Sequence, residues 1–140
     1  MRSITVLEWI LRIAGLGALI LGLLFWITRL NIIPIHMLFG LLVALTLLII
    51  SLLAVFARGL RLLGGVGIVY AIFLPLFGLN QVFILPGSLH WLIQVAHLLV
   101  GIGALALAGI TAMRYRRLKQ NICNTTTSEP VAGQIRETTY

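Results

Sequence analysis

The chain has 140 residues, of which 61% are hydrophobic and only 9% are charged, and its formal net charge is +7. A soluble domain is about half apolar and about a quarter charged. This chain has too little polar surface to cover a globule in water, so the lipid bilayer is its expected environment.

Four apolar runs follow one another along the chain. Each is close to or above the roughly 20 residues that an α-helix needs to cross a hydrocarbon core. The expected helices cover about residues 9–28, 32–57, 62–79 and 89–113. No segment alternates apolar and polar residues over about ten positions, as the strands of a membrane barrel do. The predicted fold class is therefore all-α: an integral membrane four-helix bundle of two helical hairpins, within a transmembrane domain of residues 1–119.

The first run is expected to be a retained helix and not a cleavable signal peptide. Its apolar stretch is long, it has no small-x-small cleavage site, and it carries Glu8 and Arg12 at its start. Spaced i, i+4, these two can pair on one helix face. Alternatively, they only mark the helix end, with Arg12 extending its charge towards water.

The positive charges predict an orientation and exclude a nucleic-acid partner. Lys and Arg accumulate on the cytoplasmic side of short loops, and only Arg29 lies between the first and second helices. The cations at the opposite ends of the helices are Arg2, Arg12, Arg58, Arg61, Arg114, Arg116, Arg117 and Lys119. The sequence therefore predicts both termini inside (N-in/C-in), in a multi-pass protein of the cell inner (plasma) membrane.

The last 21 residues differ in composition from the rest. Residues 120–140 are polar, with few large apolar side chains, and are expected to form a disordered cytoplasmic tail. The tail holds the chain's one cysteine, Cys123, so a disulfide framework within the chain is excluded.

The second and fourth helices share a short motif. His36 opens the stretch HMLFG and His97 opens HLLVG, both of the form H-x-L-x-G. If the match is an internal repeat, the two hairpins enter the membrane in the same direction. Small residues also recur at intervals that favour close helix packing: Ala14, Ala18 and Gly22 on the first helix, and Gly101 and Gly109, with Leu105 between them, on the fourth.

Three histidines are expected in the outer half of the membrane. His36 lies 22 residues before Arg58, whereas His90 and His97 lie 24 and 17 residues before Arg114. His97 is thus roughly 7 Å deeper than His36, and His90 roughly 3 Å shallower. Near the interface a histidine can simply bond to water or headgroups, but ionisable residues at depth usually face a partner or a pathway.

The remaining polar residues disfavour several functions. The chain has no Asp, its Glu residues lie outside the expected membrane interior, and no Lys precedes Lys119. Proton-coupled transport normally needs a carboxylate or basic relay within the membrane, and channels need a ring of carbonyls or charges. No pairing of a nucleophile with a base is evident for hydrolysis.

Metal chemistry remains for histidines in an apolar bundle. Neutral imidazole is a common haem ligand, and four-helix bundles hold cofactors between facing helices. Gly40 and Gly101 lie one turn beyond His36 and His97 on the same faces, where a missing side chain leaves room for a macrocycle edge. The absence of C-x-x-C-H excludes covalent c-type attachment.

On these residues the chain resembles small bis-histidine b-type membrane cytochromes over about residues 9–113. It is also similar to small bacterial four-helix membrane proteins with a histidine at the start of the second helix and a HWLIQVxH-like fourth helix. The first resemblance implies haem b, electron transfer and a membrane redox partner. With three histidines in place of four, it implies at most one haem.

His90 and His97 rise from one helix about 10 Å apart, so they cannot be opposite ligands of one iron. Depth slightly favours His90 as the partner of His36, but the shared motif and deeper shielding favour His97, and the sequence prediction is His36 with His97. Gln94 would then orient a ligand or propionate, and His90 would bond a propionate or admit protons.

Three alternatives remain. A non-catalytic bundle could serve as an accessory or assembly subunit of a larger membrane complex. A copper site could use the three histidines with Met37. A quinone pocket could use Gln94 or a histidine on the carbonyl, lined by Trp91 or Tyr70.

Overall fold

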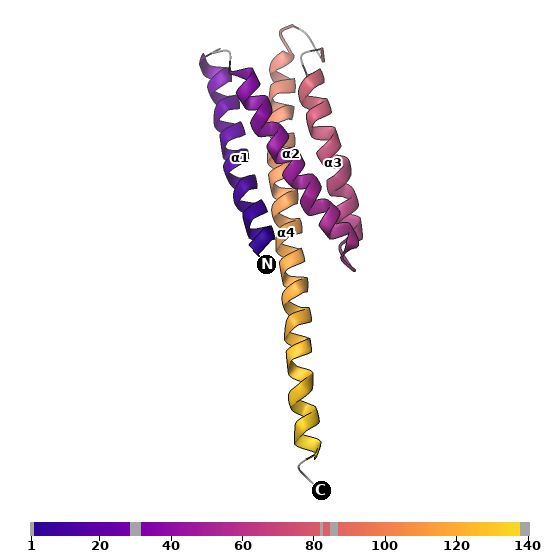
Figure 1. Cartoon of the computed structure of the whole chain (residues 1–140). Helices are drawn as coiled ribbons and strands as arrows, with labels where there is room; N and C mark the ends of the chain where they lie inside the picture. Colours follow the sequence, from indigo (N-terminus) through magenta and orange to yellow (C-terminus); the bar gives the residue numbers. More distant parts are fainter. Residues whose placement is uncertain (1, 29–31, 82, 85–86, 138–140) are drawn as a thin grey trace.

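The computed structural model describes residues 2–28, 32–81, 83–84 and 87–137. Its helices are α1 (Arg2–Thr28), α2 (Ile33–Phe56), α3 (Arg61–Asn80) and α4 (His90–Glu137) (Figure 1). The described ranges contain no strand. The prediction of four helices is confirmed, and the breaks between them fall within about two residues of the predicted positions.

Each helix is long and apolar enough to cross a membrane. The apolar side chains that face away from the other helices are extensively exposed, as on α1, where Ile13 and Leu16 are 62% and 61% exposed. Such a surface suits a lipid environment, because helices in a bilayer need no polar outer face. The protein therefore has the composition of a multi-pass membrane protein.

The two outer ends of the helical region differ from the sequence prediction. α1 begins at Arg2, well before residue 9, and α4 continues to Glu137, through residues 120–137. This part of α4 projects beyond the other three helices (Figure 1). Composition predicts a disordered tail there because little apolar surface can be buried, but a helix can satisfy its own backbone hydrogen bonds without burial.

The helices have a simple pattern of neighbours. α2 contacts α1, α3 and α4, and α4 also contacts α1 and α3, whereas the described parts of α1 and α3 do not touch. α2 runs obliquely across α4 (Figure 1). Both α2 and α4 begin at the same end of the molecule, so they run in the same direction, as the shared H-x-L-x-G motif suggested.

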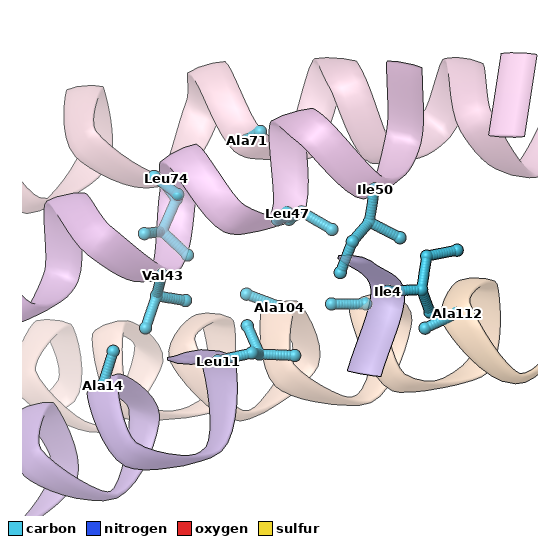
Figure 2. Close-up of a cluster of buried hydrophobic side chains, with 12 residues drawn as sticks. Ile4, Leu11, Ala14, Val43, Leu47, Ile50, Ala71, Leu74, Ala104 and Ala112 are labelled. Atoms are coloured by element: carbon cyan, nitrogen blue, oxygen red, sulfur yellow. The ribbon is translucent and has the colours of Figure 1, made fainter. Parts of the chain in front are cut away.

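The core is built around small residues of α4. Ala104, Ala108 and Ala112 are fully buried, and Leu47 and Ile50 of α2 pack against this face (Figure 2). Alanine lets the helix backbones approach closely, which matters where lipid tails are as apolar as the core.

The prediction that the face of α4 with Gly101 and Gly109 packs against other helices is therefore wrong. The face that packs is rotated from it by part of a helical turn. An added Cβ would meet nothing within 4 Å at Gly101 or Gly109, whereas Leu105 packs against Gly15 of α1. On α1 the prediction fares better, since Ala14 is buried and Gly22 lies against a side chain of α2.

The predicted pairing of Glu8 with Arg12 is replaced by a tertiary contact. The carboxylate of Glu8 on α1 lies 2.9 Å from the guanidinium of Arg116 on α4. Arg12 instead lies over the ring of Trp9, with the guanidinium carbon 5.9 Å from the ring centroid. Glu8 faces α4 and is buried, so pairing with Arg116 compensates the cost of removing its charge from water.

Candidate functional site

His36 of α2 and His97 of α4 lie side by side although 61 residues separate them in the sequence. Their ring centroids are 6.0 Å apart and the ring planes are inclined at 58°. The sequence places His97 deeper in the membrane than His36 if both helices are untilted, but the two rings are nevertheless in contact. The oblique crossing of α2 over α4 (Figure 1) accounts for this, because tilt changes the depth at which a given residue lies.

A third helix fixes the ring of His36. Its Nδ1 lies 2.9 Å from the carbonyl oxygen of Ala18 on α1. A carbonyl can only accept, so Nδ1 carries the proton and donates it. In the neutral imidazole this leaves the lone pair on Nε2. Gly22, one turn further along α1, makes room for the ring: a Cβ there would lie 3.1 Å from Cε1 of His36.

The ring of His97 is held by α3. It stacks on Phe77, with centroids 6.0 Å apart and planes inclined at 25°. A Cβ at Gly78 would lie 3.3 Å from Cε1 of His97, so this glycine leaves the space that the ring occupies. The Nδ1 atom of His97 is buried and has no hydrogen-bond partner among the described residues. A buried ring nitrogen without a partner is costly, because the hydrogen bond that it would make to water is not replaced.

Aromatic rings continue from His97 along α3. Phe77 stacks on Phe73 with centroids 5.5 Å apart, and Phe73 contacts Tyr70 with centroids 6.4 Å apart. The Tyr70 hydroxyl donates a 2.9 Å hydrogen bond to the carbonyl of Val100 on α4. This bond joins α3 to α4 one turn beyond His97.

The other predicted site residues are His90, Gln94, Gly40 and Gly101. His90 is the first residue of α4 and, like Gln94, is half-buried. No hydrogen bond joins Gln94 to either ring among the described residues. At Gly40 and Gly101 an added Cβ would meet nothing within 4 Å. The glycines that touch the rings are instead Gly22 on α1 and Gly78 on α3.

The two imidazole rings lie at the distance of an ordinary ring–ring contact. Rings in such contact have centroids about 4.5–7 Å apart. The observed separation is 6.0 Å. Within the described part of the chain, no group of three or more His, Cys, Asp or Glu side chains could hold a metal ion. The copper alternative with all three histidines is therefore not assembled.

Sequence reasoning singled out the two histidines but missed the residues that hold them. Ala18 and Gly22 were noticed only as packing residues, and their spacing of four was the available signal. Phe77 and Gly78 had none, because they are ordinary residues of an apolar helix. Comparison with known proteins adds nothing to these residues, since no family model, no curated protein and no solved structure matches the chain.

Proposed function

We propose that the protein is a membrane-embedded electron-transfer protein that binds one b-type haem between His36 and His97. The single observation that carries the proposal is the 6.0 Å approach of these rings from two different helices. It also rests on the donor chemistry, because neutral imidazole is a common axial ligand of haem iron.

The surroundings of His36 support a role as a ligand. Histidines that bind metal almost always donate their other ring N–H to a carbonyl or carboxylate, which fixes the tautomer and orients the ring. The bond from His36 Nδ1 to the Ala18 carbonyl has that form. It leaves Nε2 as the coordinating atom.

His97 would be the second ligand, with its ring stacked on Phe77. The open space at Gly40 and Gly101 would admit the macrocycle edge. The chemistry that haem supplies when bound is one-electron transfer at the iron. Gln94 and His90, which open α4 towards the membrane surface, would bond polar groups at the rim of the site. The expected partners are a membrane redox protein or a quinone.

The test is spectroscopic. The full chain, expressed with haem supplied and purified in a mild detergent, is expected to show a Soret band and a spectrum that changes on reduction. The expected stoichiometry is one haem per chain, because the site uses one pair of histidines. A colourless protein that binds no added haem would reject the proposal.

The proposed placement is the inner (plasma) membrane, with both termini in the cytoplasm and the histidines near the outer face. The cations that cluster at one end of the helices support this orientation through the positive-inside rule. A reporter fused after Tyr140 is expected to behave as cytoplasmic, and one inserted between Gln81 and Pro86 as exterior. An exterior C-terminal reporter would reverse the orientation and place the histidines at the inner face.

A non-catalytic bundle, acting as an accessory or assembly subunit of a larger complex, is the second candidate. The observation that favours it is also the His36–Ala18 bond, because polar side chains join membrane helices through such hydrogen bonds without any cofactor. The absence of bound haem after supplementation, with a folded protein, would support this candidate.

A further inference from the structure

A second site lies at the end of the bundle opposite to the histidines. A groove of about 350 Å³ separates parts of α1 and α4, a volume within the usual range of about 300–1,000 Å³ for small-molecule sites. It is lined by Glu8, Leu11, Arg12, Gly15, Leu16, Leu19, Leu105, Gly109, Met113 and Arg116. None of these residues takes part in the proposed haem site.

The groove is lined by charged residues at one end and by apolar residues along the rest of its length. Glu8 and Arg12 lie near the start of α1 and Arg116 faces them from α4, while leucines line the groove further into the bundle. A ligand that fits this distribution has a polar head and a long apolar tail. The groove also opens outwards from the bundle, to the side on which the acyl chains of a bilayer would lie.

The charge at the mouth is positive. The Glu8 side chain is only 10% exposed and is engaged by Arg116, whose own side chain is 39% exposed. Arg12 is exposed and its guanidinium makes a cation–π contact with Trp9. One unit of positive charge thus remains after pairing, at guanidinium groups that bind phosphate well. Basic sites between membrane helices are suited to anionic lipid headgroups.

We propose that this groove binds one anionic phospholipid, with its headgroup phosphate at Arg12 and Arg116 and one acyl chain along Leu16, Leu19 and Leu105. Gly109 keeps the groove open, because a Cβ there would meet nothing within 4 Å. The lipid would stabilise the contact of α1 with α4 next to the Glu8–Arg116 pair.

The experiment compares two lipids with identical acyl chains, phosphatidylglycerol and phosphatidylcholine. Each is added to the delipidated full chain in detergent, and binding is measured by native mass spectrometry. One phosphatidylglycerol per chain is expected to bind at least about fivefold more tightly than phosphatidylcholine, the ratio that about 1 kcal/mol per surface cation provides. Equal binding of the two lipids would overturn the proposal.

Two variants locate the lipid, and one serves as their control. Arg12→Gln is expected to weaken phosphatidylglycerol binding about fivefold, and Gly109→Leu to abolish it by filling the groove. Gly65→Leu is the matched control, since an added Cβ at Gly65 on α3 also meets nothing within 4 Å. It is expected to bind as the wild type does. If Gly65→Leu lowers binding as much as Gly109→Leu, or if Arg12→Gln keeps the full preference, the lipid does not occupy this groove.

Discussion

His97→Ala is expected to abolish the Soret band of the haem-supplied protein, and His36→Ala is expected to do the same, whereas His90→Ala retains it. The two rings whose centroids lie 6.0 Å apart belong to His36 and His97, and each is expected to be a ligand of the iron. Loss of an outer-shell partner alone typically costs about 10–100-fold in metal affinity. Loss of a direct ligand is expected to cost more. Absorption spectra and haem titration of the three variants measure the effect.

A further variant separates ligation from folding. His36→Gln retains a side-chain N–H that can reach towards the Ala18 carbonyl, the present partner of His36, but it does not provide an imidazole ligand. We expect it to keep the melting temperature of the apoprotein while losing haem. If His90→Ala loses haem and His97→Ala keeps it, the ligands lie nearer the membrane surface. That outcome would contradict the His36–His97 pair.

The number of helices and the breaks between them were predictable because hydropathy alone carries that information. A run of about 20 apolar residues can span a bilayer whichever of its faces packs against other helices. In the sequence, such runs are interrupted around residue 30, Arg58 and Pro86. The outer ends at Arg2 and Glu137 were not predicted. At these ends the sequence becomes polar, and polarity does not distinguish a continuing helix from an irregular segment.

The rotation of each helix was much harder to predict. A soluble helix shows its buried face as an apolar stripe, but these helices are apolar on all sides, so the stripe carries no information. The face of α4 that packs is marked by Ala104 and Ala108, whereas the spacing of the neighbouring glycines predicted a different face. The partner of Glu8 was missed for the same reason, because Arg116 becomes its neighbour only once α1 and α4 are correctly rotated.

The approach of His36 to His97 could be predicted because polar residues are rare in these helices. Two histidines in matching H-x-L-x-G contexts, on helices expected to be parallel, are expected to face one another. The supporting residues could not be predicted in this way. A backbone carbonyl such as that of Ala18 is present at every position of α1, and only the packed structure selects which one accepts the bond.

Gly64→Ala is expected to destabilise the fold strongly, although it adds a single methyl group. A Cβ at Gly64 on α3 would lie 2.6 Å from the backbone nitrogen of Val55 and 2.7 Å from the carbonyl oxygen of Ser51, both on α2. Backbone atoms cannot rotate away as a side chain can, so the two helices would have to separate. Overpacking of this kind costs about 1–3 kcal/mol in the free energy of unfolding. Thermal unfolding of the purified variant in detergent measures the loss.

The neighbouring residue provides the control for this experiment. Gly65 is on the same turn of α3, but an added Cβ there meets nothing within 4 Å. Gly65→Ala should therefore stabilise the protein slightly, since alanine favours a helix over glycine by up to about 1 kcal/mol. The two substitutions are chemically identical and adjacent, so lipid, detergent and helix propensity act equally on both. Equal melting temperatures for the two variants would mean that α2 and α3 do not approach as closely as these distances require, and a lower one for Gly65→Ala would mean that α3 turns its other face to α2.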